Sequence, residues 1–181
     1  MDQPYEPDRD LVVNAASRWD LTAFGDVLAV AEQIGTNKGD RKVIDLYRTW
    51  IALHGAGGRH SHAAWFNLGA EWNHAGEPEN AILAYRAALA LRPDFAPAAI
   101  NLGLLLEQHG EPQLALACWA DALQRDAARV ALLNQRARLL EQLGQLPDAE
   151  AAMRASLMIQ HDQPDVIQGN RLNGGSSFRR G

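Results

Sequence analysis

The sequence has few of the features that point to disulfide bonds, nucleic acids or membranes. Cys118 is the only cysteine in 181 residues, so no disulfide can form within the chain. The net charge of −5 disfavours a nucleic-acid backbone as a partner. No apolar run is long enough to span a bilayer, and residues 1–8 are acidic, unlike a secretory signal. We therefore expect a cytoplasmic protein that engages neither a membrane nor nucleic acid.

The chain also lacks a recognisable catalytic or metal-binding constellation. His60 and His62 are spaced to chelate a metal, but no Cys, Asp or Glu stands at ligand spacing among the neighbouring histidines. The glycine-rich run 55–58 has neither a preceding strand nor the Gly-Lys-Ser/Thr of a phosphate loop. Cys118 falls beside Trp119, where we interpret it as a buried and inert thiol. The sequence thus predicts no catalysis, no metal and no cofactor.

What the chain does contain is a repeat of 34 residues. Gly76, Gly110 and Gly144 stand one period apart, and each is followed five residues later by an alanine. A period of this length is typical of a helix–turn–helix unit stacked on its neighbours. The three glycines are expected to end the first helix of each pair, and Pro78 and Pro112 suit the first turn of the next helix. The predicted fold class is therefore all-α.

The repeat also predicts how the helices pack. Gly69 and Gly103 have no side chain, so a partner helix can approach closely at both positions. Tyr85, Trp119 and Met153 share one place in the period, on the second helix of each pair. We expect these three bulky side chains to fill the space between the units.

This pattern resembles the tetratricopeptide repeat (TPR) family, whose unit is written W-x2-L-G-x2-Y…A-x3-F…P. The first unit carries it as Trp65, Leu68, Gly69, Trp72, Gly76, Ala81, Tyr85, Ala88 and Pro93. The match extends from His62 to His161 and weakens in the third unit. The resemblance implies a right-handed superhelix of antiparallel helix pairs that binds a protein or an extended peptide.

The expected organisation has four parts. They are an N-terminal helical region at 1–55, a glycine-rich joint at 56–61, three repeats at 62–95, 96–129 and 130–161, and a disordered tail at 162–181. In the N-terminal region, Asp20 can cap a helix that ends near Ile34, and Asp40 can cap a second helix that ends near His54. This pair has the size of one repeat without its signature residues, so we interpret it as a degenerate or capping unit.

In TPR arrays the first helix of each pair lines the concave face, which the resemblance transfers to this chain. The polar residues expected there are Asn67, His74, Asn101, Gln108, Asn134, Gln135 and Arg138. Asn67 and Asn101 occupy the same place in the period, with Gln135 as the third member. Each side-chain amide offers a donor and an acceptor, so such a column can hydrogen-bond an extended peptide backbone. The column resembles the asparagine ladder in the TPR arm of O-linked N-acetylglucosamine transferases.

Two other interpretations of these positions were weighed. The amides can simply be solvated polar residues, which need no functional reason at an exposed site. A carboxylate clamp of the chaperone-adapter kind is disfavoured, because Arg138 is nearly the only basic residue at the inward positions and a carboxylate held by charge needs Arg or Lys.

A narrower resemblance gives the alternative function. Residues 94–107, 151–157 and 161–168 look like the last repeats of bacterial Spindly-type glycosyltransferases, where the repeats lead into a catalytic domain that uses a UDP-sugar. After Gln168 the chain departs from that pattern, so no catalytic or sugar-binding residue is carried over. The alternative is therefore a truncated substrate-recognition arm of such an enzyme.

The C-terminal end of the repeats predicts a further contact. The last repeat helix carries several apolar residues, whereas Val166 and Ile167 are all that the following segment offers to cover them. A solenoid needs a polar cap over its last unit, and an exposed apolar end is a docking surface. We therefore expect possible self-association through the uncapped C-terminal repeat.

Overall fold

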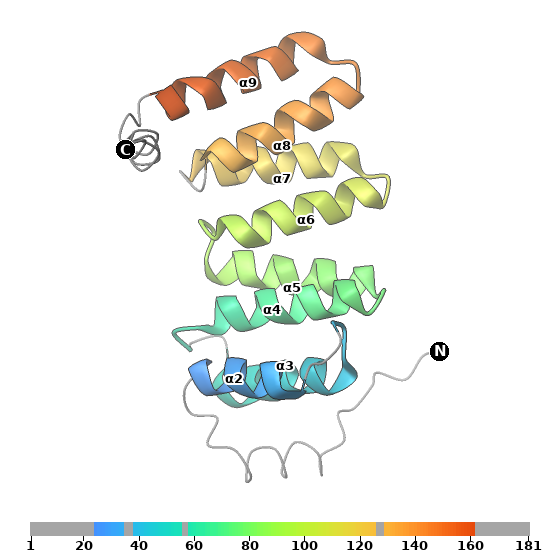
Figure 1. Ribbon diagram of the computed structural model, residues 1–181, viewed down its shortest axis with the longest axis vertical. Coiled ribbons are helices and arrows are strands. Elements are labelled where there is room, and N and C mark those ends of the chain that lie inside the picture. The colour runs from blue at the N-terminus through green and yellow to red at the C-terminus, as the bar shows by residue number, and fades with distance from the viewer. Residues whose placement is uncertain (1–23, 35–37, 56–57, 126–128, 162–181) are drawn as a thin grey trace, which may run out of the picture. The chain divides into compact units, whose positions relative to one another are not determined.

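The computed structural model describes residues 24–34, 38–55, 58–125 and 129–161 (Figure 1). Within these ranges the chain forms eight helices and no strand. The helices are α2 (Phe24–Ile34), α3 (Arg41–His54), α4 (Ser61–His74), α5 (Pro78–Leu91), α6 (Ala96–Gln108), α7 (Pro112–Gln124), α8 (Arg129–Gln142) and α9 (Leu146–His161). The all-α prediction is confirmed. The predicted cap at Asp20 and the predicted tail at 162–181 lie outside the described residues.

The chain divides into two compact units. Residues 1–127 form the first unit, which contains α2 to α7, and residues 128–181 form the second, which contains α8 and α9. In the first unit each helix from α2 to α6 packs against the next one in the sequence (Figure 1). In the second unit α8 and α9 form a single antiparallel pair.

The glycines of the repeat end three helices in the same way. Gly76, Gly110 and Gly144 have φ of 77°, 77° and 73°, the left-handed conformation that glycine adopts without steric cost. The N–H of the residue after each glycine then donates to a carbonyl five residues back, as Glu77 does to Trp72 at 2.9 Å. Because α5 begins at Pro78 directly afterwards, the turn is very short. The predicted caps are confirmed.

Close packing at two helical glycines fixes the spacing of the first unit. A Cβ on Gly69 would lie 2.7 Å from the Tyr85 ring, and one on Gly103 would overlap the Trp119 indole. Tyr85 and Trp119 are 1% and 0% exposed, so neither ring has room to move away. The predicted close approach is confirmed at both glycines.

We also predicted that Met153, like Tyr85 and Trp119, fills the space between units. This prediction is wrong, because the Met153 side chain is 50% exposed. In the second unit α8 packs against the face of α9 that carries the buried Ala149, Ala152 and Ser156. Met153 lies on another side of α9, where no other described element of its unit packs. Position in the period therefore did not determine burial.

The pair α2 and α3 follows the plan of a repeat more closely than its sequence suggests. Asp40 caps α3 as predicted, with its carboxylate accepting from Lys42 N at 2.8 Å. Tyr47 stands 16 positions after Ala31, the spacing that also separates Tyr85 from Gly69. Both Ala31 and Tyr47 belong to the buried core.

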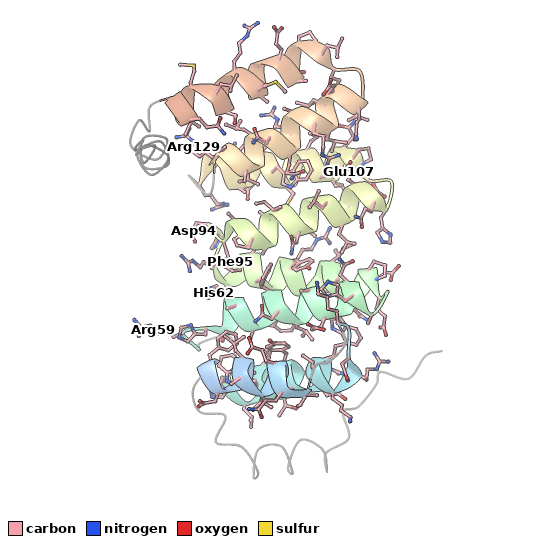
Figure 2. All side chains as sticks on the ribbon, in the orientation of Figure 1. Arg59, His62, Asp94, Phe95, Glu107 and Arg129 are labelled. Carbon is pink, nitrogen blue, oxygen red and sulfur yellow. The ribbon has the colours of Figure 1, made fainter. Side chains whose placement is uncertain are left out.

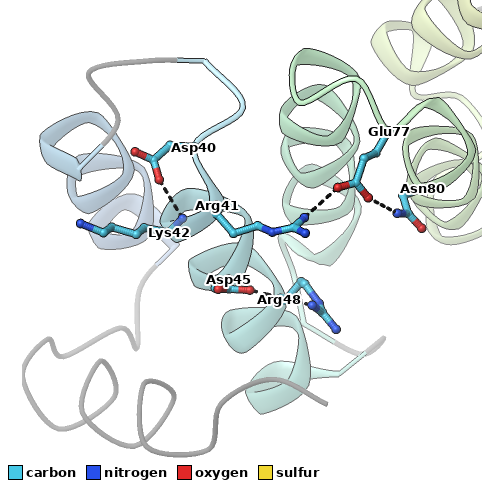
Figure 3. A network of polar contacts seen from close by, with 7 residues as sticks. All are labelled: Asp40, Arg41, Lys42, Asp45, Arg48, Glu77 and Asn80. Atoms are coloured by element: carbon cyan, nitrogen blue, oxygen red, sulfur yellow. Dashed lines mark hydrogen bonds and ion pairs between the residues drawn. The ribbon is translucent and has the colours of Figure 1, made fainter. Parts of the chain in front are cut away.

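Polar contacts join α3 to the first TPR-like pair, as Figure 3 shows. The Arg41 guanidinium donates to the Glu77 carboxylate at 2.8 Å, and Asn80 donates to the other oxygen of that carboxylate at 2.7 Å. The Gly39 N–H donates to Glu71 Oε2 at 2.7 Å. These contacts position α3 against α4, and so determine which side chains meet between them.

Candidate functional site

Two neighbouring hollows form a groove in the first unit. One has a volume of about 370 Å³ and is lined by Tyr47 and Asn67, among others. The next has a volume of about 260 Å³ and is lined by Tyr85 and Asn101. Ala70 lines both hollows, so they adjoin. We call the surface formed by these five residues the inner groove.

The same pair of side chains recurs in the two hollows. The Asn67 amide donates from Nδ2 to the Tyr47 hydroxyl oxygen at 3.4 Å, and the Asn101 amide donates to the Tyr85 hydroxyl oxygen at 3.5 Å. In each pair the tyrosine comes from the second helix of one repeat and the asparagine from the first helix of the next. The repeat thus presents a tyrosine–asparagine pair at successive steps along the groove.

The pairs differ from simple solvated amides in their surroundings. Tyr47 and Tyr85 are 5% and 1% exposed, whereas Asn67 and Asn101 are only half-buried. Burial raises the pKa of both tyrosine hydroxyls, so each stays protonated at neutral pH. Each hydroxyl that accepts from an asparagine therefore keeps its own O–H for donation.

The chemistry of such a pair suits a polypeptide backbone. Long contacts of 3.4 and 3.5 Å are weak hydrogen bonds, so the amides can shorten or exchange them at small cost. The asparagine oxygen accepts from a backbone N–H, while the amide N–H and the tyrosine O–H donate to a backbone carbonyl. Acidic side chains accompany this arrangement, since Glu32 and Glu71 line the first hollow together with Lys38.

The residues predicted for the concave face fall into two groups. In the first unit His74 and Gln108 line the second hollow beside Asn101, as Asn67 lines the first. Asn134, Gln135 and Arg138 belong to α8 in the second unit. The sequence analysis missed Tyr47 and Tyr85 as polar partners, although both precede an asparagine of the column by less than one repeat period.

In the second unit the predicted amides contact side chains of their own helix pair. The Ser156 hydroxyl, which is buried, donates to Asn134 Oδ1 at 2.7 Å. The Arg138 guanidinium donates to Gln135 Oε1 at 3.3 Å and to Gln142 Oε1 at 3.2 Å. The acceptor oxygens of Asn134 and Gln135 are therefore engaged within α8 and α9.

A larger hollow of about 570 Å³ lies among α3, α4 and α5. Trp65 and Trp72 are half-buried and line it. The guanidinium of Arg41 lies over the Trp72 ring, 5.3 Å from its centroid, while the same residue pairs with Glu77. Aromatic packing and an internal ion pair account for these side chains without a ligand.

The chemically reactive side chains of the described ranges are placed for packing. No group of three or more His, Cys, Asp or Glu is arranged there to hold a metal ion. His62 at the start of α4 accepts from Arg92 at 3.3 Å and meets the edge of Phe95, and Figure 2 shows His62 beside Phe95. Burial raises the pKa of the Cys118 thiol to about 11, and its Sγ donates to Ala99 O at 3.6 Å. Such a thiol is protonated and unreactive at neutral pH.

No described helix has the length and apolar character needed to cross a bilayer.

Comparison with known proteins agrees with the repeat. The family model described as tetratricopeptide repeat matches residues 44–96 and 100–165, which is more than half of the chain. The chain belongs to the tetratricopeptide repeat family. The first matched segment begins inside α3, so the family pattern reaches into the region that precedes the recognisable repeats.

Two solved structures of MamA have a similar fold. The first matches with a TM-score of 0.65 and 19% sequence identity over 85% of this chain and 86% of that chain. The second matches with a TM-score of 0.65 and 18% identity over 85% of this chain and 81% of that chain. No curated protein sequence is detectably similar. The narrower resemblance to Spindly-type glycosyltransferases receives no support from these comparisons.

Proposed function

We propose that the protein is a non-catalytic cytoplasmic scaffold that holds an extended segment of a partner protein in the inner groove. In this proposal Asn67 and Asn101 bind the backbone of the segment, assisted by the hydroxyls of Tyr47 and Tyr85. Membership of the TPR family supports a role in protein interaction, since repeats of this kind stack to create extended binding surfaces.

The observation that carries the proposal is the recurrence of the tyrosine–asparagine pair. A single half-buried asparagine needs no explanation, but two that meet a buried tyrosine hydroxyl in equivalent places form a regular series. Groups at regular steps match the regular spacing of N–H and C=O in an extended chain. Because the series would bind backbone atoms, we expect affinity for many sequences that share an extended conformation.

The test begins with peptides selected by the full chain from a library of random unstructured peptides. Their affinities are then measured by fluorescence anisotropy for the native protein and for the Asn67→Ala/Asn101→Ala variant. We expect the double variant to bind every selected peptide about tenfold more weakly or worse, because each lost backbone contact removes about 1 kcal/mol of binding free energy.

The matched control is Asn80→Ala. Asn80 is also an asparagine at a helix surface of the first unit, but its amide donates to Glu77 at 2.7 Å, outside the inner groove. This variant should bind the selected peptides as the native protein does. Equal binding by native protein and double variant, with helix content unchanged by circular dichroism, would remove the basis of the proposal.

The second candidate is the substrate-recognition arm of a Spindly-like O-glycosyltransferase. It is favoured by the placement of Asn67 and Asn101 in one groove, since an asparagine column is the feature that it shares with that class of enzyme. The gene sequence beyond residue 181 distinguishes the two candidates, because only this one requires a UDP-sugar domain there. In both cases the present chain should not bind a UDP-sugar in calorimetric titration.

A further inference from the structure

One side of α9 differs from the matching side of α5 and α7. The side is defined by positions at intervals of four, three and four residues. In α5 it consists of Pro78, Ile82, Tyr85 and Leu89, in α7 of Pro112, Leu116, Trp119 and Leu123, and in α9 of Leu146, Glu150, Met153 and Leu157. We call the last set the α9 stripe. Every member is buried or half-buried in α5 and α7, and every member is exposed in α9.

The exposed α9 stripe is apolar at three of its four positions. Leu146, Met153 and Leu157 are 61%, 50% and 54% exposed. Met153 stands seven residues after Leu146, and Leu157 follows four residues later, as on a helix that packs along a second helix. In α5 the matching Tyr85 packs its ring against Gly69 of α4 and accepts from Asn101 of α6 at 3.5 Å. The α9 stripe therefore has the form of a surface that accepts another helix.

The chemistry of the chain narrows the choice of that helix. By the repeat period, residues 164–174 correspond to α6, but they place Asn170, Arg171 and Asn173 where α6 buries Leu102, Gly103 and Leu105. Apart from Val166 and Ile167, the sequence of this segment is therefore polar where α6 is apolar, which disfavours it as the partner of the stripe. The α2 helix of another copy fits no better, because its exposed side carries charged and polar residues, namely Asp26, Glu32 and Gln33.

We propose that two copies of this protein associate through their α9 stripes, with the two helices antiparallel. About a two-fold axis between residues 151 and 152, Leu146 of each copy faces Leu157 of the other, and Glu150 faces Met153. Glu150 then lies beside Arg154 of the other copy. Within one chain these two residues already form an ion pair of 2.7 Å, so each pair meets a second one with its charges reversed. A parallel arrangement would place Glu150 beside Glu150 and oppose association.

This pairing is closed, because both copies use the same surface. It differs from a head-to-tail contact, which would continue into a filament. The α9 stripe shares no residue with the inner groove, so the dimer would carry two grooves for a partner, and a partner with two binding segments would gain apparent affinity from their linkage.

The test is sedimentation velocity of the full chain over a range of micromolar concentrations. We expect a reversible monomer–dimer equilibrium in the native protein. Met153→Glu and Leu157→Glu should each raise the dissociation constant by about tenfold or more, because each places a charge in an apolar contact. The matched control is Leu114→Glu in α7. Leu114 is 49% exposed and lies off the equivalent stripe, so the equilibrium should stay as in the native protein.

A substitution that should strengthen association tests the same surface. Glu150→Leu restores the apolar residue that Ile82 and Leu116 provide in α5 and α7, and should lower the dissociation constant. Orientation is tested in a Cys118→Ala background by mixing Leu146→Cys protein with Leu157→Cys protein under oxidation. The mixture should form a mixed disulfide, whereas neither protein should cross-link with itself.

Three results would overturn the proposal. They are a native protein that remains monomeric at every concentration, a dimer that persists unchanged in Met153→Glu and Leu157→Glu, and self-cross-linking of the Leu146→Cys protein, which would require parallel helices. Because the substituted leucine and methionine side chains of α9 are 50% exposed or more, circular dichroism should show native helix content for these variants.

Discussion

The two units of this chain use the same repeat positions for different contacts. In the first unit Asn67 and Asn101 reach tyrosine hydroxyls across contacts of 3.4 and 3.5 Å. In the second, Gln135 occupies the matching place in the period but accepts from Arg138 of its own helix at 3.3 Å. The period determines where the amide stands, and its neighbours determine what it can bind. Peptide binding is accordingly expected in the first unit.

Packing differs between the units in the same manner. Gly103 of the first unit lies directly against the buried Trp119 ring, while in the second unit Ala137 takes the place of Gly103 and Met153, in the place of Trp119, is 50% exposed. The tightly packed Gly103–Trp119 contact holds its two helices rigidly together. The exposed Met153 side chain is free to contact another protein surface. The following predictions test these differences, beginning with the largest expected effect.

Gly103→Ala should lower the free energy of unfolding by about 2–4 kcal/mol. A Cβ there would overlap the indole of Trp119, which is 0% exposed and has no space to shift. The reverse change in the second unit, Ala137→Gly, should cost no more than about 1 kcal/mol, the usual penalty of glycine inside a helix. Urea unfolding of both variants checks the contrast, which would fail if the two losses were equal.

Gly110→Ala and Gly144→Ala should have similar effects on the two units, since their helix caps do not differ. Both glycines have positive φ with open space around them, so alanine meets strain in the backbone alone. Each substitution should cost about 1–2 kcal/mol in urea unfolding. Gly25→Ala is the control, because no atom lies within 4 Å of its added Cβ and its φ is not positive. A loss on Gly25→Ala as large as on the other two would contradict the role of the positive φ.

The hydroxyl contacts of the amides can be removed separately in each unit. Ser156→Ala deletes the 2.7 Å hydrogen bond to Asn134 and should cost about 1 kcal/mol of unfolding free energy. Tyr85→Phe deletes a contact of 3.5 Å and should cost about 0.5 kcal/mol of unfolding free energy. It should nevertheless lower the affinity for selected peptides severalfold. Thermal unfolding and peptide titration of both variants provide the readouts. Undiminished peptide affinity in Tyr85→Phe would exclude its hydroxyl from binding.

Arg41→Ala should have the smallest effect. Its ion pair with Glu77 is short at 2.8 Å, but the two side chains are 58% and 37% exposed. Exposed pairs of this kind contribute about 0.5 kcal/mol or less. Differential scanning calorimetry in low and high salt measures the loss, and a loss above about 1 kcal/mol would show that Arg41 stabilises the first unit beyond this pair.

The fold could be predicted from the sequence at positions where the backbone geometry favours one particular residue type. The glycine at each helix end and the proline two positions after Gly76 and Gly110 specify the turns locally, so the turns followed from spacing alone. The exposure of Met153 could not be predicted in this way, because it depends on which elements pack against α9 in space. Periodicity reports equivalent positions and does not report whether a neighbour is present.

The candidate site was predictable in part. The shared position of Asn67 and Asn101 followed from the period, but their tyrosine partners did not. Tyr85 precedes Asn101 by 16 residues, whereas Tyr47 precedes Asn67 by 20, because the joint before α4 lengthens the connection. That shift of four residues hid the equivalence of the two tyrosines. Only the packed helices bring each hydroxyl to its amide.

The central claim concerns the two asparagines of the inner groove, and their side-chain amide signals in NMR test it most directly. Titration of a selected peptide into labelled full-length protein should shift the Asn67 and Asn101 side-chain signals together, with the same midpoint. The signal of Gln135, held by Arg138, should stay in place. Binding that leaves the Asn67 and Asn101 signals unmoved would contradict the proposed groove.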